Sequence, residues 1–222
     1  MSDNPGFSVR VDLHVHTRCY SPCAEGLDPV QLIGCLAPSR LQGLVITEHD
    51  HLWPSAEIDA LNRLATYGRI YRGIEVSSCN GHFIIIGLDH LPPPPVGISI
   101  DDLMDYLRPT VAAVIWAHPY LNYGSTSAAL SADRMPQGIH AVEVASGVTI
   151  GEQHRQAQTL AMSRGWVAVG GSDAHTIGQV GCAYTLFNAL PPDEKALALA
   201  IRQGRCRAGH CSPATPMRSV CC

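Results

Sequence analysis

The chain of 222 residues contains little charge and almost no lysine. Charged residues make up 15% of it, the formal net charge is −4, and only one of the 15 basic residues is a lysine, Lys195. No run of basic residues occurs, and since binding to a nucleic-acid backbone requires clustered positive charge, we expect no nucleic-acid partner. Hydrophobic residues nevertheless make up 46%, enough for a substantial core. The length favours one domain, with a short appendage at most.

Long apolar runs and paired cysteine motifs are also missing. No apolar run approaches the roughly 18 residues that a membrane-spanning helix needs, so we expect no membrane partner. Residues 1–10 are polar and lack the apolar stretch of a signal peptide, which predicts a cytoplasmic protein. The nine cysteines are then expected to be reduced thiols, and their spacing matches no structural zinc site.

Apolar runs of strand length alternate with amphipathic stretches along most of the chain. Runs such as LVITEH and AAVIWAH are apolar throughout, which is typical of strands buried on both faces in a parallel sheet. Strands are predicted at 8–16, 43–49, 70–77, 82–88, 112–118, 141–145 and 167–172. Helices are predicted at 29–36, 56–65, 100–107, 153–163 and 193–202. This order predicts an α/β fold, in which the third and fourth strands follow closely enough to form a hairpin or a tight crossing.

The most informative local motif is Asp12-Leu13-His14-Val15-His16 in the first predicted strand. Residues two apart point to the same side of a strand, so His14 and His16 present two imidazoles together. Asp12 is expected on the same side, where its carboxylate would orient an imidazole of a metal site. The alternative for this motif alone is a pair of polar histidines at a strand end, with no metal.

Other predicted strands also carry histidine or carboxylate side chains at or near an end. These residues are His49 and His51 with Glu48 and Asp50, then Glu75, His82, His118, Glu143, Asp173 and His175. Parallel α/β barrels place functional side chains at the C-terminal ends of their strands, so a barrel would gather these groups into one ring. Six imidazoles and several carboxylates exceed what one zinc ion takes. We therefore expect two or three divalent metals, and mixed nitrogen and oxygen ligands favour Mn²⁺, Fe²⁺ or Zn²⁺.

Together the motifs resemble the PHP family, named for polymerase and histidinol phosphatase. The resemblance covers roughly residues 9–208 and is carried by DLHVHT, ITEHDH, GIEVS, the His82 strand, AHPY, VEVAS and GSDAH. It implies a distorted (β/α)7 barrel in a single domain over residues 1–208, with two or three metals at the strand C-termini. It also implies hydrolysis of phosphate esters. Residues 209–222 show no periodicity and are expected to form a loose tail.

Transferred position by position, the resemblance implies eight metal ligands. They are His14, His16, His49, Glu75, His82, His118, Asp173 and His175. Glu75 falls on the carboxylate that usually bridges two metals. Glu48 stands where the family usually has an aspartate, and its longer side chain is expected to support the ligands from behind. After His16 the family usually supplies a further Asp or His ligand; here Glu25 is the best candidate, with Cys23 as the alternative.

The expected function is that of a metal-dependent phosphoric ester hydrolase, which would attack a small phosphorylated metabolite through a metal-bridging hydroxide. The guanidinium of Arg18 suits a phosphate, and His51 or His175 is the candidate acid for the leaving group. The alternatives are a hydrolase of a C–N or cyclic ester bond with the same metal site, and a non-catalytic metal-binding PHP module. Cys19 and Cys23 are interpreted as small buried thiols. The oligomeric state stays open.

Overall fold

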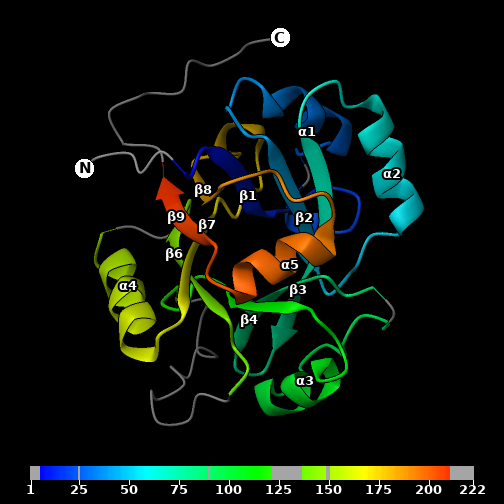
Figure 1. The fold of residues 1–222 in the computed structure, drawn as a ribbon. Helices are drawn as coiled ribbons and strands as arrows, with labels where there is room; N and C mark the ends of the chain where they lie inside the picture. Colours follow the sequence, from blue (N-terminus) through cyan, green and yellow to red (C-terminus); the bar gives the residue numbers. More distant parts are fainter. Residues whose placement is uncertain (1–5, 25, 90, 122–136, 149–150, 211–222) are drawn as a thin grey trace.

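The protein was examined as a computed structural model, which describes residues 6–24, 26–89, 91–121, 137–148 and 151–210 (Figure 1). Within these ranges nine strands form one sheet in the order β7-β6-β5-β4-β3-β2-β1-β8-β9. The strands are β1 (Val9–Val15), β2 (Gly43–His49), β3 (Arg69–Ser78), β4 (Gly81–Ile86), β5 (Ala113–Trp116), β6 (Ala141–Ser146), β7 (Val167–Gly171), β8 (Ala183–Phe187) and β9 (Cys206–His210). The sheet curls until β7 packs beside β1, β8 and β9, which makes a nearly closed barrel.

The sheet is mixed, whereas the uninterrupted apolar runs predict a wholly parallel one. β1, β2 and β3 are parallel, as are β5, β6 and β7, but β4 runs antiparallel to both of its neighbours. Of the two alternatives for the third and fourth strands, the structure has the hairpin. The antiparallel pairing of β4 with β5 was not expected, because Phe83 and Ile85 pack in one apolar cluster and Ile84 and Ile86 in another. A strand buried on both faces reads as apolar throughout, whichever way it runs.

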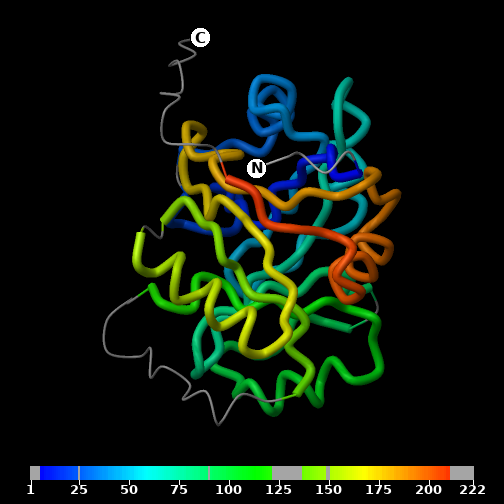
Figure 2. Tube along the Cα trace, turned by 60° about the vertical axis from the view of Figure 1, so that its left-hand side comes forward, coloured from blue at the N-terminus to red at the C-terminus, as the bar shows by residue number. Residues whose placement is uncertain are grey.

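The described residues form five helices, which pack around the curled sheet (Figures 1 and 2), and the last of them places Leu197, Ala198 and Ile201 in the same apolar cluster as Tyr71 and Ile86. They are α1 (Pro29–Leu36), α2 (Ser55–Leu64), α3 (Ile100–Leu107), α4 (Glu152–Arg164) and α5 (Glu194–Arg202), with 3-10 turns η1 (Pro22–Ala24) and η4 (Ile177–Gln179). Local sequence sets their ends. The carboxylate of Asp28 accepts the N–H of Val30, the hydroxyl of Ser99 accepts the N–H of Asp102, and Gly165 ends α4 at φ +65°. Among the described residues, no helix is both long and apolar enough to cross a membrane.

The last two strands, β8 and β9, are not predicted by the sequence pattern. β8 is short and pairs antiparallel with β1, and β9 has no apolar alternation and pairs along β8 (Figure 2). Their place in the sheet comes from backbone pairing, which a residue pattern does not reveal. β9 continues to His210, two residues past the boundary predicted at residue 208. The rest of the predicted tail, residues 211–222, lies outside the described residues.

The inside of the barrel changes from apolar to ionisable along each strand. Alternate residues of a strand share one face, so the face of β3 that buries Tyr71 also carries Glu75. In β4 the face that buries Ile86 and Ile84 ends at His82. The ionisable side chains at one end of the barrel therefore pack against an apolar interior.

Candidate metal centre

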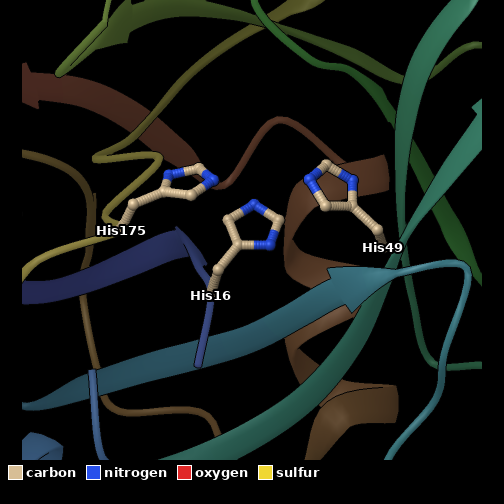
Figure 3. Close-up of side chains that lie close together, drawn as sticks. All are labelled: His16, His49 and His175. Atoms are coloured by element: carbon tan, nitrogen blue, oxygen red, sulfur yellow. The ribbon is translucent and has the colours of Figure 1, made fainter. Parts of the chain in front are cut away.

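Six imidazoles and two carboxylates meet at one end of the barrel. They form four overlapping groups, in each of which three ligand atoms lie within 4.8 Å of one another. The groups are His14–His16–Glu75, His14–His118–Asp173, His49–Glu75–His82 and His16–His49–His175, the last of which is drawn in Figure 3. All eight ligand positions implied by the resemblance are thus brought together, although their role as ligands stays a prediction.

Glu75 lies at the centre of the cluster and is fully buried. Its Oε1 is 3.0 Å from Nδ1 of His82 and 3.1 Å from Nε2 of His118. Its Oε2 is 3.2 Å from Nε2 of His16 and 3.0 Å from Nδ1 of His49. The sheet produces this arrangement because His49 of β2 is directly opposite Glu75 of β3. Nε2 of His14 also lies 3.4 Å from Oε2, so the two oxygens of the carboxylate face different sets of imidazoles.

The second carboxylate of the cluster, Asp173, is also buried and follows the end of β7. Its Oδ1 is 3.4 Å from Nε2 of His14 and 3.3 Å from Nε2 of His16. The backbone carbonyl of Asp173 is 2.9 Å from Nδ1 of His175, which orients that ring. Both Asp173 (φ +52°) and His118 (φ +26°) have left-handed backbone conformations, which are strained for residues with a Cβ. Strain of this kind concentrates at functional sites, where the surrounding structure holds it in place.

Asp12 does not orient an imidazole, and this expectation from the strand alternation is wrong. Its carboxylate accepts backbone N–H groups from His14 (3.2 Å), Ser172 (2.8 Å) and Gly181 (2.9 Å). The pairing of β1 with β2 shifts its register between Asp12 and Val15, which breaks the simple alternation along β1. Burial raises the pKa of Asp12 to about 6, although these hydrogen bonds oppose the shift. Asp12 thus ties β1 to the segment after β7.

Glu143 performs the orienting role instead. Its Oε1 is 3.2 Å from Nδ1 of His14, and its Oε2 accepts the N–H of His118 at 3.0 Å. Gly171 makes room for this pair, because a Cβ there would lie 2.5 Å from Cβ of His14 and 2.7 Å from Oε1 of Glu143. The sequence shows Glu143 as a carboxylate inside an apolar strand but does not indicate which residue it would contact. The same signal identified Glu75, because a buried carboxylate needs a partner.

Glu48 supports the cluster from behind. It is fully buried and accepts hydrogen bonds from the N–H of Thr17 at 3.1 Å, from the hydroxyl of Thr17, and from Nε1 of Trp53 at 2.9 Å. These contacts hold the residue after His16 against the loop that follows His49. Glu48 is longer than the aspartate that is usual at this position, and its side chain reaches the indole of Trp53.

The remaining predicted site residues lie apart from the cluster. The guanidinium of Arg18 is paired with the carboxylate of Asp28 and is 56% exposed. The ring of His51 stacks on Tyr20 at 3.8 Å and belongs to none of the four groups. Glu25 lies outside the described residues, so its choice over Cys23 stays a prediction.

The two nearby thiols were expected to be buried, and this expectation is wrong. Cys19 and Cys23 are both exposed. They lie in the turns between β1 and α1, where Ser21 and Ala24 occupy the buried positions and the two thiols face outward.

The carboxylates dominate the electrostatics of the cluster. Burial alone would lower the pKa of the His14 imidazole. The charges of Asp173, Glu75 and Glu143 outweigh burial and raise the pKa of His14 well above its ordinary value. Burial likewise would raise the pKa of Glu75, but His14 and the other histidines in contact with it lower that pKa well below its usual range. Negative charge at this place is stable only beside positive charge.

The residues present fit a metal centre. Oε2 of Glu75 and Oδ2 of Asp173 are buried, and neither has a hydrogen-bond partner among the described residues. A carboxylate oxygen without a donor is costly in a protein interior, and a cation removes that cost. Imidazole and carboxylate are the ligands that zinc, iron and manganese take.

Part of the chain matches a known protein family. Residues 151–206 match the family model described as PHP-associated. No curated protein sequence matches the chain.

Solved structures share the fold over nearly the whole chain. PsfC from Pseudomonas syringae PB-5123 is 19% identical, with a TM-score of 0.68 and 92% of each chain covered. An amidohydrolase from Chromobacterium violaceum, with bound sulfate and no metal, is 19% identical, with a TM-score of 0.62 and coverage of 92% and 99%. A candidate metal-dependent phosphoesterase from Bifidobacterium adolescentis is 14% identical, with a TM-score of 0.60 and coverage of 87% and 96%. The predicted α/β barrel is thus confirmed, and over residues 151–206 the chain is similar to the PHP-associated family.

Proposed function

We propose that the protein is a metal-dependent hydrolase of phosphate esters, with a small phosphorylated metabolite as its substrate. The convergence of six imidazoles with Glu75 and Asp173 at the open ends of the strands carries this proposal. The similarity of the fold to that of the candidate metal-dependent phosphoesterase supports it.

The four groups of ligand atoms would hold two or three divalent metals, with Mn²⁺, Fe²⁺ or Zn²⁺ as the candidates. Such metals, when bound, act as Lewis acids toward phosphoryl oxygens and lower the pKa of bound water. Glu75 is suited to bridge two of them, since its two oxygens face different sets of imidazoles. Glu143 keeps His14 in the tautomer that donates from Nδ1, which leaves the lone pair of Nε2 for a metal.

The proton for the leaving group has two candidate sources, His51 and His175. His175 faces the carbonyl of Asp173 through Nδ1, and its pKa is lowered first by burial and then by the charges of His16 and His49. A neutral ring with one nitrogen so engaged suits a metal ligand better than an acid. His51 belongs to none of the metal groups.

Arg18 remains the candidate phosphate contact, although its guanidinium now pairs with Asp28. To bind a phosphate, Arg18 would have to exchange this exposed ion pair for the substrate. Such an exchange costs little, because exposed ion pairs contribute roughly 0–1 kcal/mol.

Cleavage of a C–N bond at the same metals is the second candidate function. The similarity in fold to the Chromobacterium violaceum amidohydrolase favours it. A metal site of this kind activates water against carbon and phosphorus centres alike, so the two functions differ in substrate and not in the ligand set.

Turnover of p-nitrophenyl phosphate with added Mn²⁺, followed by a panel of phosphorylated metabolites, tests the proposal. A parallel panel of amides and cyclic esters tests the second candidate. We expect phosphate release that the chelator EDTA abolishes and that Glu75→Gln lacks. Fully metal-loaded protein that releases no phosphate from any member of the panel would contradict the proposal, and hydrolysis of amides alone would favour the second candidate.

A further inference from the structure

The outer face of the sheet carries two arginines where β8 pairs with β1 on one side and with β9 on the other (Figure 1). Arg10 of β1 and Arg207 of β9 are both register partners of Leu186, so they flank this residue at a separation of roughly 10 Å, two strand spacings. Their chain neighbours Val11 and Cys206 belong to the apolar cluster inside the barrel, so the two arginines point outward. We name Arg10 and Arg207 the arginine pair.

Aromatic rings hold both guanidinium groups. Cζ of Arg10 is 4.7 Å from the centroid of the Tyr184 ring, and Cζ of Arg207 is 5.4 Å from the centroid of the Phe7 ring. At such distances a guanidinium is attracted by the face of the ring. Tyr184 is itself buried and packs so closely on Gly209 that a Cβ there would lie 2.4 Å from Cε2 of the ring. The arginine pair is therefore pre-organised, which lowers the entropy cost of binding a ligand.

The arginine pair has no counter-charge among the described residues. The arginine–carboxylate ion pairs of this part of the chain are made by other arginines, namely Arg18, Arg72, Arg108 and Arg155. Nε of Arg207 is buried and has no hydrogen-bond partner within the described ranges. Arg207 has thus lost part of its hydration without gaining an acceptor, which is costly for a charged group. Because Nε itself is covered, an anion that supplied the opposite charge would bind at the terminal nitrogens.

We propose that the arginine pair binds a small anion that carries phosphoryl groups. A guanidinium donates two parallel hydrogen bonds to a phosphate, a geometry that an ammonium group lacks. A phosphoryl group carries about two negative charges at neutral pH and so matches two guanidiniums, whereas one carboxylate would match only one. The formal net charge of the chain is −4, so the attraction must come from these two side chains and not from the molecule as a whole.

The proposed anion site is separate from the metal centre. Arg10 precedes His14 by four residues, roughly 13 Å along a strand, and points out of the barrel. The eight candidate metal ligands do not include either member of the arginine pair. The inference therefore does not rest on the proposed function, and loss of hydrolytic activity would not affect it.

The test is a calorimetric titration of pyrophosphate into the whole chain after its metals have been removed, because bound metals would also take up phosphoryl groups. We compare the wild type with Arg10→Met and Arg207→Met, which remove the charge, and with Arg207→Lys, which keeps the charge but not the planar group. Arg63→Met is the matched control, since Arg63 is an exposed arginine in the last turn of α2 and makes no ion pair with a described residue. Circular dichroism shows whether each variant is folded, and citrate replaces pyrophosphate in a parallel series.

We expect one pyrophosphate to bind per wild-type chain. Arg10→Met and Arg207→Met should each weaken binding about 10- to 100-fold, the usual cost of a hydrogen bond to a charged group. Arg207→Lys should lose about 10-fold, because an ammonium cannot donate the two parallel bonds. Arg63→Met should bind as the wild type does.

Four results would overturn the inference: no saturable binding by the wild type, unchanged binding in the variants of the arginine pair, an equal loss in Arg63→Met, or tighter binding of citrate than of pyrophosphate. If a methionine variant did not fold, Arg207→Lys would decide. A loss of affinity there would support the inference, and unchanged affinity would contradict it.

Discussion

His14 and His140 both belong to the barrel, yet their pKa values shift in opposite directions. His140 precedes β6, where its Nδ1 accepts the N–H of Val114 at 3.1 Å. Burial, together with the charge of Arg202, lowers the pKa of His140 to about 4. His14 is fully buried at the other end of the strands, and the surrounding carboxylates raise its pKa well above the ordinary value.

The difference shows what the carboxylates of the cluster do. Burial by itself removes the proton from an imidazole, as at His140. Only a concentration of negative charge reverses this effect, and such charge is costly to bury without a cation. In metal-free protein, protons on the histidines supply the positive charge. Metal ions would replace those protons, so metal binding should release protons and strengthen as the pH rises.

Removing the charge of Glu75 should break this arrangement most severely. Glu75→Gln keeps the shape of the side chain but takes away the charge that faces five imidazoles. We expect loss of bound metal and a fall in turnover larger than the roughly 100-fold that an outer partner of a metal ligand costs. Metal content, phosphatase rate and circular dichroism measure the effect.

Glu152→Gln is the control for this variant, because Glu152 is an exposed residue paired with Arg155 on α4. It should behave as the wild type. If Glu75→Gln kept wild-type metal content and rate, the assignment of Glu75 as a ligand would be wrong.

Glu143→Gln should produce a smaller effect of the same kind. Nδ1 of His14 and the N–H of His118 face different oxygens of Glu143, and the amide replaces one of these acceptors with an NH2 donor. We expect metal affinity to fall about 10- to 100-fold with the fold intact, measured by a Zn²⁺ titration of metal-stripped protein in competition with a chromogenic chelator. A loss as large as that of Glu75→Gln would show that Glu143 is itself a ligand, and no loss would show that His14 needs no partner.

His140, at the opposite end of the barrel, leads to a prediction about how stability depends on pH. The pKa of His140 is lowered from 6.5 to about 4 in the folded protein, so the unfolded chain binds more protons between these values. Its contribution to stability is therefore present above pH 6.5 and is lost as the pH falls toward 4. In His140→Asn, which keeps an acceptor for Val114, the loss of unfolding free energy between pH 7 and pH 5 should be about 2 kcal/mol smaller than in the wild type.

Urea unfolding of both metal-free proteins at the two pH values measures this difference. Equal losses in the two proteins would mean that His140 is not held in its neutral form.

Cys19→Ser should have the smallest effect. Cys19 is exposed, and its backbone N–H, which the substitution preserves, donates to the hydroxyl of Thr17. Metal content and turnover should stay within about two-fold of the wild type, as is usual for a surface substitution. Loss of either would place the thiol at the metal centre.

The sequence predicted the cluster better than it predicted the contacts that support it. The sequence could predict that His49, Glu75 and His82 lie together, because strand periodicity and a common end of the barrel decide where such side chains meet. The role of Asp12 was mispredicted, because a register shift in β1 is a property of two paired strands and not of one sequence segment. Ser21, a buried residue whose hydroxyl oxygen lies 3.3 Å from Nδ1 of His16, gave no signal at all, since a lone serine in a turn is usually a solvated residue.

The antiparallel strands were missed for a related reason. β8 and β9 complete the sheet by backbone pairing with β1 and with each other. Pairing with a strand that is far away in the sequence leaves no recognisable pattern in the residues that form the pair.

The most direct test of the central claim is the number of metal ions per chain. Elemental analysis of the purified protein, repeated after reconstitution with Mn²⁺ or Zn²⁺ and removal of excess ions, gives this number. The account predicts at least two transition-metal ions per chain in the wild type and a clear loss in Glu75→Gln. Less than one ion per chain after reconstitution would contradict it, because the buried carboxylates and their imidazoles would then have some other purpose.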